Sequence, residues 1–172
     1  NALDRYLKSQ GDKVALLFEP NDPSESCQNI TYSELHKRVC KMANVLIEMG
    51  IQKGDRVCIY LPMIPELAVS VLACARIGAI HSVVFAGFSS SAVSARINDS
   101  ECKMVITSDG SYRGDKTINL KGIVDDALER CPSVKNVLVV NRIGGTINMK
   151  EGRDQWLQPL LEKASTHCTA EI

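Results

Sequence analysis

A short polar stretch, residues 112–116 (YRGDK), carries the clearest potential for binding chemistry in this sequence. Its two cations, Arg113 and Lys116, stand three residues apart with Gly114 between them. Arginine offers a planar pair of donors and lysine a compact charge, so together they could clamp a terminal phosphate. The same pattern also fits a solvated surface loop, and it does not decide between these two interpretations.

A second stretch, residues 85–89 (FAGFS), follows an apolar run and precedes a helical pattern. A glycine with small neighbours lets a ligand approach the backbone, and the amino end of the next helix favours an anion. The stretch consists of Phe85, Ala86, Gly87, Phe88 and Ser89. An ordinary turn from strand to helix is the alternative interpretation.

Familiar catalytic motifs do not occur in the sequence. It contains no G-x-x-x-x-G-K-[ST], G-x-G-x-x-G, H-E-x-x-H or G-x-S-x-G. The three histidines, His36, His81 and His167, are far apart and belong to no ligand or triad motif. We therefore predict no catalytic set and no metal site.

The elements that would position the two stretches are centred on residues 54–89. A strand over 56–61, a helix from Pro65 to about 77 and a strand over 79–85 form a β-α-β unit. The second strand is almost continuously apolar, so we expect it to be covered on both faces. Such a unit binds ligands beyond the carboxyl ends of its strands, which is where residues 85–89 stand.

The rest of the chain alternates between strand and helix patterns. This alternation predicts an α/β fold, an open, mainly parallel sheet with helices on both faces. A capping box at Thr31–Glu34 begins a helix that Gly50 ends. We expect residues 108–117 to form a polar loop, and residues 141–155 a hairpin or an extended arm. Further strands are expected at 14–19, 103–107 and 136–140, and further helices at 92–97, 120–130 and about 156–161.

Composition excludes several classes of function. The net charge is zero, with 20 basic and 20 acidic residues, and there are only one Trp, four Tyr and three Phe. We therefore expect no nucleic-acid partner. No apolar run is long enough to span a membrane, so no membrane association is expected. The seven cysteines form no C-x-x-C pair, which predicts buried thiols in a reducing compartment and a cytoplasmic location.

Three segments resemble the amino-terminal part of acetyl-CoA synthetases, AMP-forming acetate–CoA ligases of the adenylate-forming superfamily. Residues 30–35 (ITYSEL) are similar to the T-Y-x-E-L motif of the superfamily. Residues 62–89 are similar to its second core motif in the acetyl- and propionyl-CoA synthetase version. Residues 96–99 and 105–128 are similar to the block that follows. The resemblance is strongest over residues 1–140.

The resemblance implies a two-step reaction with ATP, Mg²⁺, acetate and CoA. It assigns Arg113 and Lys116 to the CoA 3′-phosphate, residues Phe85 to Gly87 to the wall beside the CoA nucleotide, and Ile118 to an apolar contact. The family often has a second arginine where this chain has Lys116, which keeps the charge but loses the bidentate fork.

Several family parts are absent from residues 1–172. These are the phosphate loop T-S-G-[ST]-T-G-x-P-K, the acetate pocket, the ribose-binding Asp and the mobile C-terminal domain. We therefore expect a single incomplete α/β subdomain of the N-terminal domain, inactive alone and with some strands unpaired. The alternatives are a self-standing nucleotide- or CoA-binding module and a fragment of a propionate–CoA ligase. No feature of the sequence indicates an oligomeric state.

Overall fold

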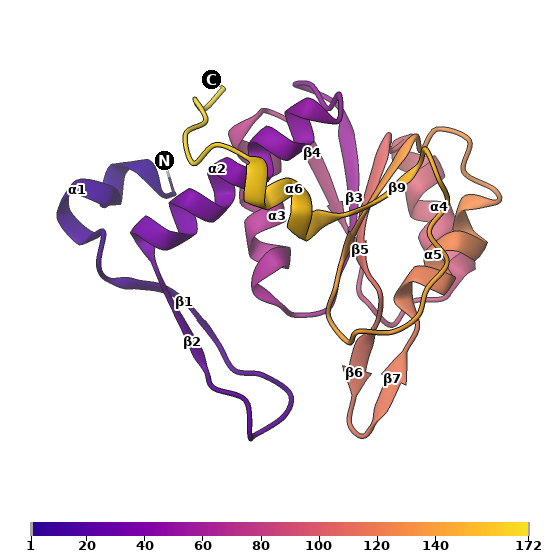
Figure 1. Cartoon of the computed structure of the whole chain (residues 1–172). Coiled ribbons are helices and arrows are strands. Elements are labelled where there is room, and N and C mark those ends of the chain that lie inside the picture. Colours follow the sequence, from indigo (N-terminus) through magenta and orange to yellow (C-terminus); the bar gives the residue numbers. More distant parts are fainter. Residues whose placement is uncertain (1, 172) are drawn as a thin grey trace.

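The computed structural model describes residues 2–171 and is built around one five-stranded sheet (Figure 1). Its strand order is β4-β3-β5-β8-β9, and every neighbouring pair is parallel. This confirms the predicted open parallel sheet. The strands are β3 (Arg56–Tyr60), β4 (Ile80–Val83), β5 (Met104–Ser108), β8 (Asn136–Val140) and β9 (Asp154–Trp156).

Helices cover both faces of this sheet, as predicted. The three inner strands bury alternate residues in two separate cores: Val57 and Ile59 of β3 face one core, and Cys58 and Tyr60 face the other. The first core packs against α2 (Tyr32–Glu48), α3 (Pro65–Arg76) and α6 (Leu157–Lys163), and the second against α4 (Ser90–Ser100) and α5 (Leu120–Leu128).

Local signals explain where the first long helix begins and ends. Thr31 caps α2, with its Oγ1 accepting the Glu34 N–H at 3.2 Å. Gly50 ends it at φ 85°, and the Ile51 N–H donates to the Leu46 carbonyl at 3.0 Å, which is a Schellman cap.

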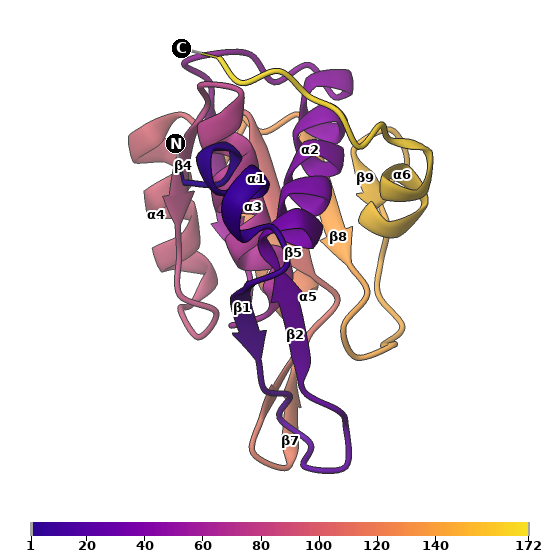
Figure 2. The ribbon, with the colours of Figure 1, turned by 90° about the vertical axis from the view of Figure 1, so that its left-hand side faces the viewer.

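The order of the strands creates a switch point. From β3 the chain crosses to β4 on one side, and then returns to place β5 on the other side of β3. Ligands of open α/β sheets bind outside the carboxyl ends of strands at such a point. Two hairpins project at this end of the molecule in both views of the ribbon (Figures 1 and 2). They are β1 (Val14–Phe18) with β2 (Gln28–Thr31), and β6 (Ser111–Arg113) with β7 (Lys116–Ile118).

Two expectations about these elements were wrong. Strand β4 is not covered on both faces: it is an edge strand, and Ile80, His81 and Val83 are exposed. Residues 108–117 are not a simple loop, because strand β5 extends to Ser108 and the β6–β7 hairpin follows.

The remaining segments are short. The chain opens with η1 (Asp4–Tyr6) and α1 (Leu7–Gln10). Residues 141–153 contain no helix or strand and run along the sheet until β9 joins its edge. None of the described helices is long and apolar enough to cross a membrane.

Candidate functional site

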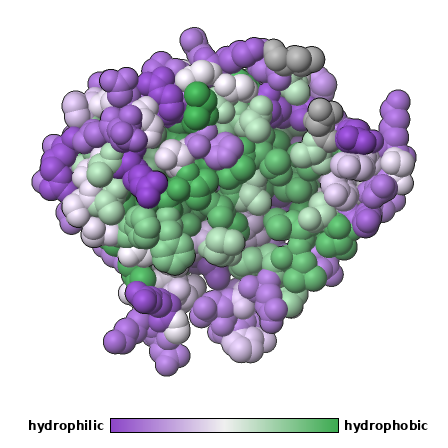
Figure 3. All heavy atoms as spheres, turned by 180° about the vertical axis from the view of Figure 1, so that it is seen from behind, coloured by the Kyte–Doolittle hydropathy of each residue, from purple (hydrophilic) through white to green (hydrophobic). Residues whose placement is uncertain are grey.

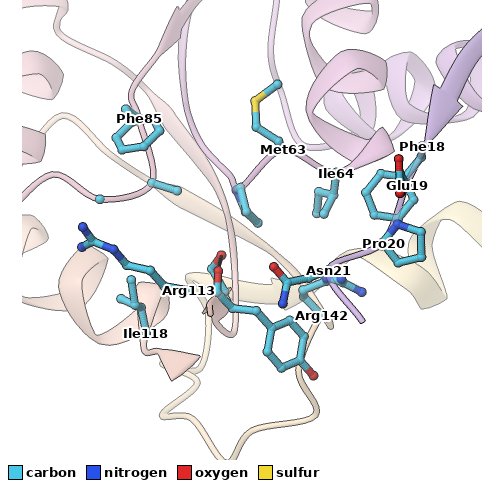
Figure 4. Close-up of a pocket in the computed structure, with 15 residues that line it drawn as sticks. Phe18, Glu19, Pro20, Asn21, Met63, Ile64, Phe85, Arg113, Ile118 and Arg142 are labelled. Carbon is cyan, nitrogen blue, oxygen red and sulfur yellow. Dashed lines mark hydrogen bonds between the residues drawn. The ribbon is translucent and has the colours of Figure 1, made fainter. Parts of the chain in front are cut away.

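A cavity of about 650 Å³ lies where four parallel strands end, between the two hairpins (Figure 4). The segment after each of these strands supplies part of its wall, and the end of β1 with the β1–β2 connection supplies the remainder. The lining comprises Pro62–Ile64 after β3, Phe85–Gly87 after β4, Ser111–Arg113 and Ile118 of the hairpin after β5, Arg142 after β8, and Phe18–Asn21.

Five of the six residues predicted as a binding surface line this one cavity. Phe85, Ala86, Gly87, Arg113 and Ile118 come from two stretches that are separate in the sequence. The topology joins them because β4 and β5 flank β3 and all three strands end at the same edge. The sixth residue, Lys116, is exposed and does not line the cavity; it pairs with Arg113 across the hairpin.

Arg113 reaches the cavity from the end of β6. Among the described residues, its side chain has no hydrogen-bond or ion-pair partner. Figure 4 shows it extending on the side where Phe85 and Ile118 lie. A free guanidinium over apolar walls is suited to a phosphate at the mouth of the cavity.

The cavity wall near this cation is apolar and accessible. Phe85 is 67% exposed and packs edge-to-face on Phe88, with 6.1 Å between ring centroids. The Tyr60 hydroxyl donates to the Phe88 carbonyl at 2.8 Å and fixes the turn. A Cβ at Gly87 would come within 2.8 Å of the Phe85 ring, so this glycine lets the ring lie over the turn.

The amino end of α4 does not take part in the cavity. Ser89 caps that helix by accepting the Ala92 N–H, and residues 89–91 do not line the cavity. Ser89 accepts only one N–H group of the first turn, so the expectation that this helix end receives an anion stays a prediction, at a place outside the cavity lining.

Two residues that sequence reasoning missed shape the cavity. The carboxylate of Asp109, 1% exposed, accepts the backbone N–H groups of Gly110, Arg142, Ile143 and Gly145. It thereby ties the segment after β8 to the end of β5 and brings Arg142 to the cavity. An Asp-Gly pair directly after a buried strand could have indicated this role for Asp109, but no local signal marks Arg142.

The described residues offer little for covalent or metal chemistry. All seven cysteines are free, and burial raises the pKa of Cys58 and Cys74, the latter to about 12, so these thiols are unreactive. No group of three or more His, Cys, Asp or Glu side chains in residues 2–171 is arranged to hold a metal ion. The lining of the cavity combines two cations, Arg113 and Arg142, with apolar side chains.

Comparisons with known proteins agree on one family. The model of a family described as AMP-binding enzyme matches residues 3–169. An acetyl-coenzyme A synthetase of Alkalilimnicola ehrlichii is 54% identical over 171 residues, which is 99% of this chain and 26% of that protein. One of Nostoc linckia is 53% identical over 156 residues, covering 91% of this chain and 46% of that protein.

A solved structure gives the same result for the fold. The acetoacetyl-CoA synthetase from Streptomyces lividans superposes with a TM-score of 0.87 at 27% identity. The match covers 99% of this chain and 25% of that one. The chain therefore spans about a quarter of the length of the first of these relatives and of this solved structure.

Proposed function

The chain belongs to the family of AMP-binding enzymes, and on that premise we propose that it forms part of an AMP-forming acetate–CoA ligase. In such an enzyme the acetate carboxylate attacks the α-phosphate of ATP and pyrophosphate leaves. The CoA thiol then attacks the acetyl carbonyl of the mixed anhydride, and AMP leaves. Within this reaction, residues 1–172 contribute part of the surface that binds CoA.

One observation carries this proposal. Five residues assigned to CoA by resemblance, from two separate stretches, line a single cavity at the switch point of the sheet. Arg113 holds the 3′-phosphate, Phe85 to Gly87 form the wall beside the nucleotide, and Ile118 adds an apolar contact. Lys116, outside the cavity, contributes a nearby positive charge rather than a direct contact.

The described residues supply neither a metal site nor a phosphate loop for the adenylation step of the reaction. ATP and Mg²⁺ belong to the proposed reaction, yet the described residues form no metal-binding cluster and the sequence has no phosphate loop. We therefore assign no residue of this chain to Mg²⁺ or to the transfer of AMP to acetate.

The affinity of the chain for CoA and for dephospho-CoA, which lacks the 3′-phosphate, tests the proposed surface. Removing the Arg113 contact in Arg113→Ala should cost about 1.5–3 kcal/mol for CoA, since it is a charge-assisted hydrogen bond. The same change should leave dephospho-CoA binding unaltered. Lys116→Ala should cost less, because Lys116 does not line the cavity.

The control is Lys163→Ala, which removes an exposed cation on α6, far from the hairpin in sequence. If the unaltered chain binds CoA and dephospho-CoA equally well, the proposed role of Arg113 is wrong. Calorimetry or NMR titration gives these affinities.

Exchange of labelled pyrophosphate into ATP tests whether residues 1–172 can carry out the adenylation step by themselves. We expect no exchange by residues 1–172 alone, because the adenylation step needs a phosphate loop that this sequence does not contain. Exchange above a heat-treated control would show that this chain adenylates, and our assignment of that step to other residues would then fail.

A further inference from the structure

Two arginines with the same exposure have very different surroundings. The side chains of Arg142 and Arg153 are each 18% exposed. Arg153 donates hydrogen bonds to the carboxylates of Asp125 and Asp154, as a guanidinium at this depth usually does. The Arg142 guanidinium has no hydrogen-bond acceptor among the described residues. Its nearest carboxylate, Glu25, stands 3.9 Å from Nη1, beyond hydrogen-bond distance.

The position of Arg142 is nevertheless tightly determined. Its backbone N–H donates to Asp109 at 2.8 Å, and the same carboxylate holds the next residues of the loop. Its guanidinium carbon lies 5.2 Å from the ring centroid of Tyr112 and 5.9 Å from that of Phe18. Aromatic rings are not conventional hydrogen-bond acceptors, so these contacts position the guanidinium and leave its N–H groups available to donate to an oxyanion.

The free donors belong to the cavity. Arg142 lines the cavity beside Asn21, as Figure 4 shows. Arg113 lines another part of the same cavity. A fixed, half-buried guanidinium with unused donors is a site for a planar or bidentate oxyanion.

We infer that Arg142 binds a diphosphate group, so that a ligand with two separate phosphate sites spans the cavity from Arg113 to Arg142. The inference rests on the proposed function, because CoA carries a 3′-phosphate and a 5′-diphosphate on one ribose. The diphosphate chemistry is shared with nucleoside triphosphates such as ATP. Glu25, the carboxylate nearest to Arg142, competes with the ligand for this guanidinium.

Inorganic pyrophosphate is the probe that tests this site without reference to CoA. In the ¹⁵N-labelled chain, pyrophosphate should shift the Nε signal of Arg142 to saturation and leave that of Arg153 in place. Arg153 is the internal control, since it has the same exposure but satisfied donors. The Arg142 signal is identified by its loss in Arg142→Lys. An unmoved Arg142 signal, or an equal shift with chloride at the same ionic strength, would overturn the inference.

Two variants give opposite expected effects. Arg142→Met keeps the length of the side chain without its charge, and should weaken pyrophosphate binding on the order of tenfold or more. Glu25→Gln removes the competing carboxylate and should strengthen binding by about two- to fivefold, as loss of an exposed ion pair permits. Weaker binding by Glu25→Gln would contradict the inference.

CoA and ATP distinguish the source of the diphosphate and separate the two proposals. CoA should shift the Nε signals of both Arg113 and Arg142, whereas ATP, which lacks a 3′-phosphate, should shift Arg142 alone. If CoA shifts Arg113 and leaves Arg142 unmoved, the proposed CoA surface stands and this inference fails. If pyrophosphate shifts Arg142 while CoA shifts neither arginine, the diphosphate site stands and the proposed CoA surface fails.

Discussion

At the scale of single residues, one buried carboxylate determines the shape of the candidate site. Asp109 stands directly after β5, and four backbone N–H groups converge on its two oxygens. Two lone pairs on each oxygen allow all of these bonds at once, which no neutral side chain of this size could do. The ligand wall after β8 therefore depends on a residue that does not touch the ligand in our proposal.

Asp109→Asn tests this role. The amide retains one acceptor oxygen and turns an NH₂ group toward N–H donors, so at least one buried donor loses its partner. We expect the free energy of unfolding to fall by about 2–4 kcal/mol. Urea denaturation measures it, with Asp115→Asn in the exposed hairpin turn as the matched control. Equal stability of the two variants would show that the carboxylate is dispensable.

Some residues of the candidate site could be predicted from a short stretch of sequence, and others could not. Arg113 and the Phe85–Gly87 turn could be predicted because each stands in a short pattern with its own chemistry. Asp109 and Arg142 could not be paired from sequence, since their hydrogen bond joins residues 33 positions apart. Lys116 was predicted beside Arg113 and is its cross-strand partner in the hairpin, but it does not line the cavity.

At the scale of elements, apolar periodicity and capping residues predicted the positions of the inner strands and of the helices. Strands β3 and β8 lie where apolar runs predicted them, and α2 begins and ends at its predicted caps. The position of β4 at the edge of the sheet could not be predicted, because an apolar run does not indicate how many neighbouring strands a strand has. The β6–β7 hairpin was missed since its strands are only three residues each and mostly polar.

A buried ion cluster joins α5 to the arm and to β9. Lys121 of α5 is fully buried, and its Nζ contacts Asp125 at 2.7 Å, Asp154 at 2.8 Å and the Asn148 carbonyl at 2.8 Å. Arg153 completes the cluster through both aspartates. This cluster explains how residues 141–153 stay against the sheet without regular secondary structure.

Lys121→Met should destabilise the chain strongly. The substitution leaves the buried Asp154 carboxylate with one cation instead of two, and loss of one partner from a buried ion pair costs about 3–5 kcal/mol. The exposed Lys163→Met should change stability by less than about 0.5 kcal/mol. Denaturant unfolding followed by circular dichroism compares them. Similar midpoints for both variants would contradict the role given to the cluster.

The contact between η1 and α3 should make stability depend on pH. Arg76 hydrogen-bonds Asp4 through two bonds of 2.9 Å and holds the pKa of that carboxyl well below its usual 3.8. A carboxyl whose pKa is lowered by folding stabilises the fold above its unfolded-state pKa. This stabilisation is lost as the pH falls below 3.8 and through the lower pKa of the folded state.

Unfolding midpoints from neutral pH to about pH 3 check this dependence. The unaltered chain should be more stable than Asp4→Asn at neutral pH, and the difference should shrink as the solution is acidified. Asp99→Asn, an exposed carboxylate on α4, is the control. A difference that stays constant over the whole range would mean that Asp4 is not linked to stability through its charge.

At the scale of the whole molecule, the sheet edge stands out on the surface. Figure 3 shows a broad hydrophobic area on the face seen from behind. The exposed apolar residues of the β4 edge and the neighbouring turns are Ile80, Val83, Phe85 and Met63. An uncovered apolar edge strand can pair with another chain, and natural proteins usually protect such edges.

The edge predicts self-association of the isolated chain. Val83→Lys should reduce it, because a charge on an edge strand opposes pairing. Ile47→Lys on α2 is the matched control, since Ile47 is 49% exposed and Val83 47%. Sedimentation over a range of concentrations measures the association. Equal association of Val83→Lys and the unaltered chain would exclude β4 as the contact.

The most direct test of the proposed CoA surface is a map of backbone amide shifts as CoA is added to the ¹⁵N-labelled chain. We predict the largest shifts at Phe85–Gly87, Tyr112, Arg113 and Ile118, around the cavity at the carboxyl ends of the strands. With dephospho-CoA, the shifts at Arg113 should disappear and those at Phe85–Gly87 should remain. Shifts concentrated at the opposite strand ends, near Gly54, Lys103 and Lys135, or no shifts at saturating CoA, would contradict the proposal.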